Sequence, residues 1–380
     1  MPIPVSGVIS SALRSAGAGQ RAISIPHGEY LVDRTSVLPS NTSVFFDDVV
    51  VRAETPQLFL KTLAGTSGVK LSGKLTYDGA GNLANAIVFN HTRDVTVQLD
   101  ADVRGLPPLR RFILCDQCDS VKVSGNYRSV DSQLFHAVDT SEVEVSGVNA
   151  GPYRIDPGDS IVRVMTKGSR GPIGRVRLHD MTIDGGGVLA KAGLIAVLAN
   201  VGQPDITDVS ISNCSVSHSL GLADGVDVNR CDRIEIRNVS GTGLNVAVAV
   251  VGSHATVDSV TGTDCRAPAF AYGDPTYQTT DIHECLASRI IARDCGQAYG
   301  SVSGSGIGVF RAGSTHTTDV LLQDVDSTDT TGHSQRFGLG VSDGVQRVRV
   351  TRGRLHGFQS AFRLLAPPSE VAFEGVSGIQ

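Results

Sequence analysis

Residues 281–284, with the sequence DIHE, bring together the side chains of this chain that are best suited to acid–base chemistry. The segment holds two carboxylates and one imidazole. An imidazole changes its charge near neutral pH, so it can take a proton from a substrate. We therefore take His283 as the candidate base, with Asp281 beside it. Glu284 is expected to face inward or into a corner of the fold.

Such a base suits a sugar acid. A proton next to a carboxylate is removed easily only if the carboxylate is neutralised, and Arg336, or Arg311, could do this by bidentate pairing. Tyr277, with Tyr272 and Tyr299 as alternatives, would supply the acid. Loss of the glycosidic oxygen would make the enzyme a lyase, whereas return of the proton on the other face would make it an epimerase.

The composition limits the classes of function. The 380 residues carry a net charge of −5 with both signs mixed, so no basic tract indicates nucleic acid. No apolar run approaches the roughly 20 residues of a membrane span. The chain has no Trp and 5% aromatic residues, which argues against a neutral sugar held by ring stacking and favours a charged or small ligand.

The beginning of the chain lacks the basic and apolar regions of a secretory signal. We expect an extracellular or virion-associated protein if a leader is missing from this sequence, and a cytoplasmic protein otherwise. The free thiols expected below agree with the cytoplasmic alternative.

The cysteines do not predict a disulfide framework, because there are seven of them in a long chain. Cys115 and Cys118 form a CxxC pair without the second pair that a structural zinc site needs, so no metal ligands are assigned. Cys214 and Cys295 are interpreted as small buried apolar side chains at one place of a repeat. No cofactor is predicted. Ca²⁺ is the alternative, at the acidic residues of segment 323–330, although such a cluster is usually a solvated turn.

A repeated pattern predicts the fold. It reads apolar, any, apolar, any, then a small or polar residue, and each copy is typical of a short strand followed by a sharp corner. A second apolar run usually precedes the next copy. Repeats of about 25 residues with two or three short strands each predict a parallel β-helix. The thirteen copies begin at residues 44, 69, 95, 121, 143, 176, 209, 234, 255, 290, 320, 348 and 371.

The two ends of the chain differ. Residues 6–17 have an apolar helical face, with Ser6 as the expected N-cap, and predict a helix that covers the first coil. Residues 23–32 then form the first strand. We divide the chain into this cap, residues 1–33, and a single β-helix domain, residues 34–380. No cap follows the last coil, so we expect a partner in an oligomer, such as a homotrimer, or further chain.

A family resemblance covers essentially the whole chain. The N-terminal helix, the segment IPHGEYLVD (25–33) and the V-x-V-x-N coils resemble the right-handed β-helices of the pectin-lyase-like superfamily. The resemblance implies an all-β, right-handed parallel β-helix of about thirteen coils. It leaves the activity open, because the superfamily includes lyases, glycosidases, C5-epimerases and phage tailspikes.

Two local resemblances concern the activity. Segment 277–284, YQTTDIHE, is similar to the Tyr-Gly-x-Asp-Pro-His-Glu motif of the mannuronan C5-epimerases. The similarity implies that Asp281, His283 and Glu284 take the roles of the family's Asp, His and Glu. The family's Pro is Ile282 here, and the Tyr lies one residue farther from the Asp.

The second resemblance is to the polygalacturonase-type glycosidases. Segment 223–228, ADGVDV, resembles their Asn-Thr-Asp-Gly-x-Asp region. Hydrolysis needs two carboxylates that flank the bond, and Leu244 and Asn245 stand where that family has its paired Asp residues. Asp224 and Asp227 are too close in sequence to flank a bond unaided.

Strand alternation predicts a row of outward side chains on the second strand of successive coils. Small residues separate the charged ones, so the row would be a groove floor for a flat ligand. It contains Asp227, Asn229, Ala247, Ala249, Asp281, His283, Gly306, Gly308, Arg336, Gly338 and Gly340. The substrate-binding residues assigned on this basis are Asp227, Asn229, Arg311, Tyr272 and Tyr299.

The favoured hypothesis is a carbohydrate-active enzyme that acts on an acidic, uronate-containing poly- or oligosaccharide by β-elimination or C5-epimerisation; a glycoside hydrolase is less favoured. The first alternative is a phage tailspike or fibre domain that binds or cleaves bacterial surface glycan. The second is a cytoplasmic β-helix enzyme that acts on a small molecule. None of the three predicts a nucleic-acid partner or a membrane association.

Overall fold

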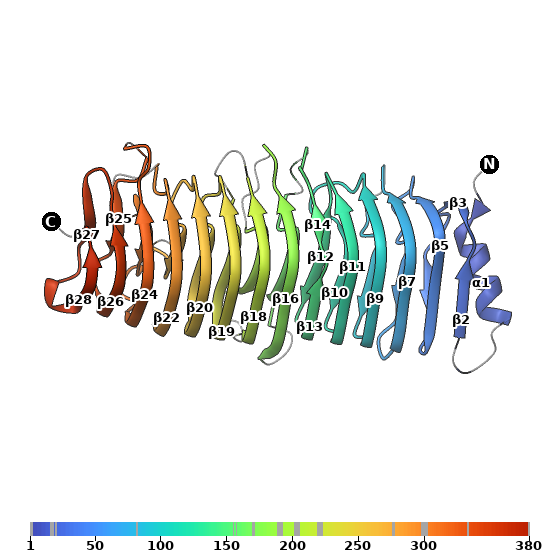
Figure 1. The fold of residues 1–380 in the computed structure, drawn as a ribbon. Helices are drawn as coiled ribbons and strands as arrows, with labels where there is room; N and C mark the ends of the chain where they lie inside the picture. Colours follow the sequence, from blue (N-terminus) through green and yellow to red (C-terminus); the bar gives the residue numbers. More distant parts are fainter. Residues whose placement is uncertain are drawn as a thin grey trace. The chain divides into compact units, whose positions relative to one another are not determined.

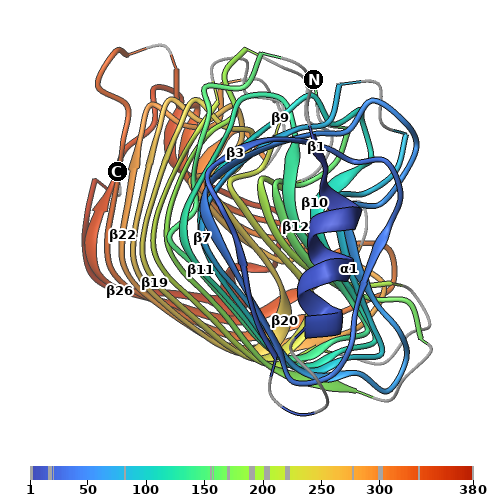
Figure 2. The ribbon, with the colours of Figure 1, turned by 90° about the vertical axis from the view of Figure 1, so that its right-hand side faces the viewer.

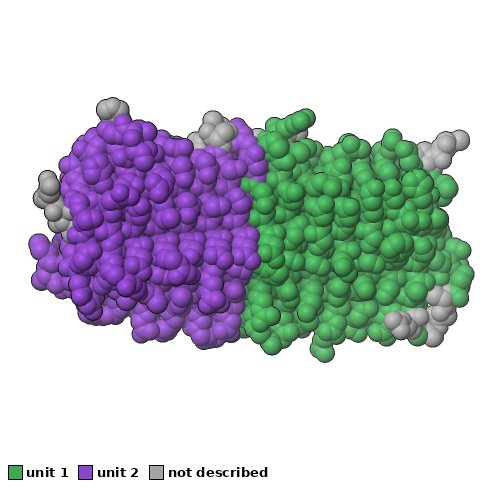
Figure 3. All heavy atoms as spheres, in the orientation of Figure 1, with its two compact units in different colours: residues 1–183 green, residues 184–380 purple. Residues whose placement is uncertain are grey.

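A computed structural model describes most of the chain as two compact units, residues 1–183 and residues 184–380, referred to as unit 1 and unit 2 (Figure 3). Each unit is built from coils of parallel strands, and the fold is a right-handed parallel β-helix (Figure 1). The described residues are 3–15, 19, 21–80, 83–154, 156, 158–168, 172–187, 193–200, 206–218, 223–275, 278–297, 303–332 and 334–378.

Unit 1 contains two stacks of parallel strands. The first stack joins β5, β7, β9, β11, β13 and β16, and the second joins β4, β6, β8, β10, β12 and β15. The elements are β1 (Ile3–Pro4), α1 (Val5–Ser15), β2 (Arg21–Ile25), β3 (Gly28–Leu31), β4 (Ser36–Leu38), β5 (Thr42–Arg52), β6 (Leu60–Thr62), β7 (Ser67–Asp78), β8 (Ile87–Asn90), β9 (Arg93–Arg104), β10 (Arg111–Asp116), β11 (Asp119–Ser129), β12 (Gln133–Val138), β13 (Ser141–Ser146), β14 (Asn149–Ala150), β15 (Val162–Thr166) and β16 (Ile173–Asp184).

Unit 2 repeats this arrangement. The first stack joins β18, β19, β20, β22, β24, β26 and β28, and the second joins β17, β19, β20, β21, β23, β25 and β27. The elements are β17 (Ile195–Ala199), β18 (Ile206–Ser217), β19 (Val226–Thr242), β20 (Val248–Thr263), β21 (Phe270–Tyr272), β22 (Ile282–Arg293), β23 (Ser305–Val309), β24 (Thr317–Thr328), β25 (Phe337–Val341), β26 (Val345–Leu355), β27 (Ser360–Leu364), the 3₁₀ turn η1 (Pro368–Glu370) and β28 (Val371–Ser377).

Helix α1 lies across the first coil of unit 1, as predicted (Figure 2), and contacts β2 and β4. Its buried apolar residues are Val5 and Ile9. The predicted N-cap is wrong: Ser6 lies inside the helix, where its N–H and Oγ donate to the Asp33 carboxylate at 3.3 and 2.7 Å. Asp33 therefore satisfies an N–H that the first turn of the helix leaves free. The predicted first strand is two strands, β2 and β3, separated at Pro26.

The corners predicted from the repeat are present. The fifth residue of most copies has a positive φ, for example 54° at Asn213, 53° at Asn238 and 52° at Asp324. A second set of left-handed residues lies within the strands of the first stack. In unit 2 this set, here called the charged corner ladder, consists of Asp208, Arg233, His254, Glu284, Asp319 and Arg347.

One register prediction is wrong, at the copy that begins with Ile290. Ala255 pairs with Cys285, and Ile290 pairs with Val260, five residues farther along. DIHE and RIIARDCG therefore belong to one strand, β22, with a left-handed residue, Arg289, between the inward pairs. The apolar alternation at Cys285 and Ala287 is a weak signal in the sequence because both inward side chains are small.

The seven cysteines are all free and buried, which agrees with the expectation for Cys214 and Cys295. Their assignment to one place of the repeat is wrong, because the register runs from Cys214 through Val239 and Val260 to Ile290. Cys295 interacts instead with Cys265, and burial raises its pKa. In the CxxC pair, Cys118 donates to the Phe89 carbonyl at 3.4 Å. These thiols serve as small core side chains.

Candidate functional sites

The predicted outward row exists in unit 2, but its members differ from those expected. Asp227 pairs with Ala249, and Ala249 pairs with Ala271 rather than with a residue of DIHE. His283 lies in the other stack, at the register of Thr318. Strand β21, of three residues, was not predicted from the sequence. Its place in the row was therefore assigned to DIHE, which belongs to the other stack. The observed row is Ala196, Asp227, Ala249, Ala271, Gly308, Gly340 and Arg363.

The small residues of this row do not form an open floor throughout. A Cβ at Gly308 would overlap the ring of Phe310, which is 2% exposed. Phe310 packs with Val246, Ala267 and Ala271 in an apolar cluster on this side of the coils. Small residues are therefore needed here to admit an aromatic side chain of the protein itself. Asp227 and Asn229, on β19, are half-buried.

Of the three tyrosines predicted to supply the acid, the structure describes Tyr272. Tyr272 is a core residue whose hydroxyl donates to the carbonyls of Gly252 at 2.8 Å and His283 at 3.1 Å, so the prediction that it binds substrate is wrong. Burial raises its pKa. Tyr277 and Tyr299 lie outside the described residues.

The predicted arginines do not accompany His283. Arg311 is bound to Asp343, with Nε donating to its carbonyl at 2.6 Å and Nη2 to its carboxylate at 2.7 Å. Arg336 is half-buried immediately before β25. Asp281 is exposed and accepts the backbone N–H of His316 at 2.7 Å. Arg311 is thus already paired with Asp343, and Arg336 adjoins the second stack whereas His283 lies in the first.

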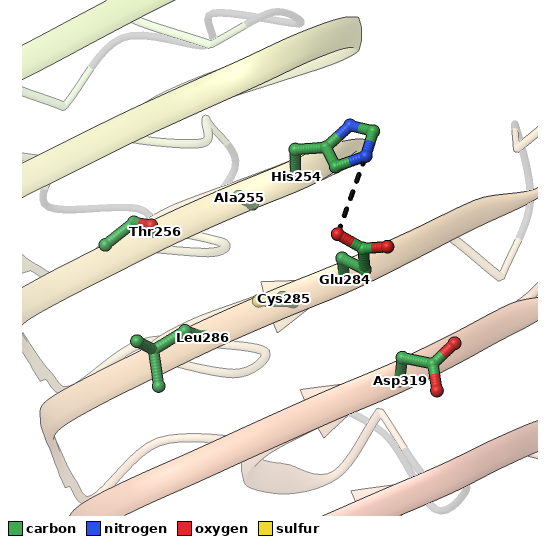
Figure 4. A pocket seen from close by; sticks show the side chains of 7 residues that line it. All are labelled: His254, Ala255, Thr256, Glu284, Cys285, Leu286 and Asp319. Carbon is green, nitrogen blue, oxygen red and sulfur yellow. Dashed lines mark ion pairs between the residues drawn. The ribbon is translucent and has the colours of Figure 1, made fainter.

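A pocket lies on the charged corner ladder (Figure 4). We call it the His254 pocket; it has a volume of about 380 Å³ and is lined by His254, Ala255, Thr256, Glu284, Cys285, Leu286 and Asp319. His254 Nε2 is 3.5 Å from Glu284 Oε2, and its ring meets that of His283 edge-on at 4.9 Å between centroids. The register of β20 and β22 produces this meeting, because it aligns Ala255 with Cys285.

The His254 pocket is rich in negative charge. His254 Nδ1 is 2.6 Å from Asp232 Oδ1, and this hydrogen bond, with the charges of Asp232 and Glu284, raises the pKa of His254. Asp319 is held by both nitrogens of the Arg347 fork at 2.6 Å, which lowers the pKa of Asp319 to about 2. A cationic ligand fits this pocket better than a uronate does.

A second pocket, which the sequence analysis missed, lies on unit 1. We call it the Arg111 pocket; it has a volume of about 290 Å³ and is lined by Arg111, Leu114, Asp116, Gln117, His136, Val138, Asp139 and Lys167. Leu114, His136 and Arg163 are register partners on β10, β12 and β15. The pocket therefore opens on the outward face of the second stack of unit 1.

Buried polar atoms without partners among the described residues occur at the Arg111 pocket and at Arg163, the register partner of His136. Both ring nitrogens of His136, which is 4% exposed, and the Nε atoms of Arg111 and Arg163 make no hydrogen bond. Such atoms are rare because each costs about 1–3 kcal/mol of unfolding free energy. A bound ligand that supplies the missing hydrogen-bond partners would account for these atoms.

Positive charge dominates at His136. Burial, followed by the charges of Arg111, Arg163 and Lys167, lowers the pKa of His136 to about 2, so the imidazole is neutral at physiological pH. Asp159 balances part of this charge, since its carboxylate oxygens lie 2.5 Å from Arg163 Nη1 and 3.6 Å from Arg111 Nη2. The signal in the sequence was QLFHAV, an apolar run with a histidine at an outward position.

Asp224 is a third feature of interest. Burial raises its pKa to about 6, opposed by hydrogen bonds from Asn245 Nδ2 at 2.8 Å and the Val246 N–H at 3.1 Å, while the charge of Asp274 raises it further. Asn245 thus contacts Asp224 from the position where the polygalacturonase-type enzymes have a carboxylate. The cluster 323–330 does not converge: Asp324 pairs with Arg352 and Asp326 with Arg354, while Asp329 accepts N–H groups of its own turn.

No protein-family model and no curated protein sequence matches this chain. Solved structures do match. The catalytic unit of a GH87 α-1,3-glucanase from Streptomyces thermodiastaticus shares 11% identity with a TM-score of 0.54, covering 100% of this chain and 67% of that one. Tailspike protein 3 of bacteriophage CBA120 shares 10% identity with a TM-score of 0.53, covering 99% of this chain and 59% of that one.

These structures share with this chain the right-handed parallel β-helix fold. At these identities the likeness concerns the fold alone, because one fold carries many activities. Within the part of the chain that the structure describes, no helix has the length and apolar character to span a bilayer.

Proposed function

We propose that this β-helix binds an acidic saccharide through the Arg111 pocket. The observation that supports the proposal is the group of buried, unpartnered donors at Arg111 and Arg163 beside neutral His136. A guanidinium matches a carboxylate with parallel N–H donors. The lining also contains carboxylates, Asp116 and Asp139, which can accept hydrogen bonds from sugar hydroxyls.

The size and composition of the pocket fit one sugar ring of a longer chain. Its lining is mostly polar and lacks aromatic side chains. Affinity would therefore come from charge-assisted hydrogen bonds rather than from ring stacking. The likeness of the fold to a glucanase and to a tailspike supports a glycan as the ligand class.

Binding is tested by titrating the full chain with oligouronates and with the same oligomers after reduction of each carboxylate to an alcohol. One charge-assisted bond contributes about 1.5–3 kcal/mol, so Arg111→Leu should weaken oligouronate binding by about 10- to 150-fold. Arg128→Leu is the matched control, since Arg128 is an exposed residue of unit 1 paired with Asp100. Equal affinity for the reduced oligomers would refute the proposal.

A second function is favoured by the neutral imidazole. We infer that the pocket is also suited to removing the proton next to a bound carboxylate, the step shared by β-elimination and C5-epimerisation, with His136 as the acceptor. A carboxylate bound between Arg111 and Arg163 would offset the charges that lower the pKa of His136. The substrate itself would thereby make the imidazole a stronger base.

Proton removal is tested by incubating oligouronates with the protein in deuterated water. Deuterium at the carbon next to the carboxylate, or an unsaturated product, should appear with wild type and not with His136→Gln. The variant should still bind the oligomer, because its arginines are unchanged. If the two proteins exchange the proton equally, His136 is not the base; the same comparison with His283→Gln tests the base predicted from the sequence.

A virion-borne glycan-binding protein is the alternative supported by the tailspike likeness. It predicts a homotrimer, which light scattering of the purified chain would detect. A monomer that turns over free oligouronates would favour the enzyme, and a trimer that only binds them would favour the alternative.

A further inference from the structure

We propose that His254, His283 and Glu284 form a binding site for a zinc-type divalent metal ion on unit 2. The three side chains come from adjacent coils and offer two imidazoles and a carboxylate, a donor set that zinc favours. One ligand atom from each residue lies within 4.8 Å of the others. The site is separate from the Arg111 pocket, so each proposal can fail without the other.

The separations fit metal coordination. Two ligands about 2.0–2.1 Å from a tetrahedral ion are about 3.3–3.4 Å apart. His254 Nε2 and Glu284 Oε2 are 3.5 Å apart. The His283 ring is 4.9 Å away between centroids and nearly perpendicular to that of His254, and its ligand nitrogen lies within 4.8 Å of the other two ligand atoms.

The surroundings of His254 orient it as a metal ligand. Asp232 Oδ1 lies 2.6 Å from Nδ1 and accepts its proton, which leaves Nε2, on the side of Glu284, as the nitrogen that can bind a metal. A carboxylate on the far nitrogen is the usual second partner of a metal-bound histidine. The backbone N–H of His283 is fixed by Ser253 Oγ at 3.2 Å, and its buried Nδ1 has no hydrogen-bond partner among the described residues.

The local charges favour a cation. Asp232 and Glu284 contact His254, and the charge of Asp319 acts on His283. Arg233 is held in ion pairs with Asp208 and Asp232, and Arg347 is held by Asp319. Three protein ligands leave a fourth position, which opens into the His254 pocket. An open position is typical of zinc sites that bind water or a small ligand rather than of structural zinc sites.

The chain contains a matched control. In unit 1, His179 Nδ1 is 2.7 Å from Asp180 and Nε2 is 3.5 Å from Glu144, so it has the same two carboxylate contacts as His254. Glu144 and His179 lie on neighbouring strands at register positions that bring no second histidine into the cluster. A metal site needs the second imidazole, whereas a simple histidine–carboxylate pair does not.

The test uses the full chain without a histidine tag, stripped with a chelator and titrated with Zn²⁺ by calorimetry against a competing chelator. We expect wild type and His179→Ala to bind one equivalent with equal affinity. His254→Ala and His283→Ala should bind more than 100-fold more weakly, and Asp232→Asn, which leaves all ligands in place, about 10- to 100-fold more weakly. Excess Ca²⁺ should not compete, because imidazole ligands disfavour it.

Three outcomes would overturn the proposal. The first is zinc binding that His254→Ala and Asp232→Asn leave unchanged. The second is an equal loss of binding in His179→Ala. The third is an intense thiolate-to-metal band on titration with Co²⁺, which would place the metal on cysteine. Should His254→Ala fail to fold, judged by circular dichroism, Asp232→Asn still decides the question.

Discussion

His136 gives the protein a calculable sensitivity to acid. Its side chain is buried, and its pKa falls from 6.5 to about 2 in the folded state. The unfolded chain therefore binds a proton below about pH 6.5 that the folded chain does not bind until about pH 2. The stabilising contribution is complete above pH 6.5 and is lost as the pH falls, by about 1.36 kcal/mol per unit.

From pH 8 to pH 4.5 this one residue should lower the free energy of unfolding by about 2.7 kcal/mol. His136→Gln keeps a polar side chain but removes the titration. Urea unfolding at both pH values should therefore show wild type losing about 2.7 kcal/mol more than the variant, because protonation of the carboxylates is common to both. His27→Gln, at a side chain that is 75% exposed, should behave like wild type.

A direct measurement accompanies the unfolding experiment. In a protein with isotope-labelled histidine, the His136 imidazole resonance should not shift between pH 8 and pH 4.5. A resonance that titrates near pH 6.5, or equal acid sensitivity in wild type and His136→Gln, would refute the reasoning. It would mean that water or an ion reaches the ring and screens the positive charges of its neighbours.

Three further predictions concern stability. Asp224, whose pKa is raised from 3.8 to about 6, costs the folded state up to about 3 kcal/mol above pH 6 and nothing below pH 3.8, so Asp224→Asn should be more stable than wild type at pH 8 and not at pH 4; equal differences at both pH values would contradict this. In thermal unfolding, Gly125→Ala should destabilise unit 1 by more than about 3 kcal/mol, because the φ of Gly125 is 131° and a Cβ would overlap the Leu99 carbonyl. Gly7→Ala in α1 is the control: a Cβ has free space there, so the variant should be more stable than wild type by up to about 1 kcal/mol. Tyr272→Phe removes a buried hydroxyl with two carbonyl acceptors and should lower the unfolding free energy by about 1–2 kcal/mol without changing ligand binding; a loss of binding would restore Tyr272 as a site residue.

The sequence predicted the coils because the pattern repeats a strong physical signal. Val69, Val95, Val121 and Val143 are aligned by register as their spacing suggested. Each bulky inward residue stacks on its equivalent one coil away. The position of the strand in one repeat therefore predicts the position of the strand in the next. The prediction was wrong where the inward residues are small, as at Cys285 and Ala287, and a neighbouring Ile290 gave a stronger apolar signal.

The site could not be assembled from the sequence in the same way. Which outward residues meet depends on the register, and a three-residue strand such as β21 is enough to move His283 from one row to another. In unit 1, His136 occupies an outward position that period-2 alternation marks as exposed. It is nevertheless 4% exposed, and Arg111 and Arg163, each placed by a different coil, lie close enough for their charges to lower its pKa. Contacts made by long side chains between coils produce no periodic pattern in the sequence.

The buried cysteines make the protein its own reporter of local opening. Two thiols lie in unit 1, at Cys115 and Cys118, and five lie in unit 2, and each is inaccessible while its coil is closed. A thiol reagent can reach a given cysteine only when the strands around it separate, and segments of one protein open with different free energies. Timed labelling followed by mass spectrometry would therefore give the order in which the coils open, and no cysteine would have to be introduced as a probe.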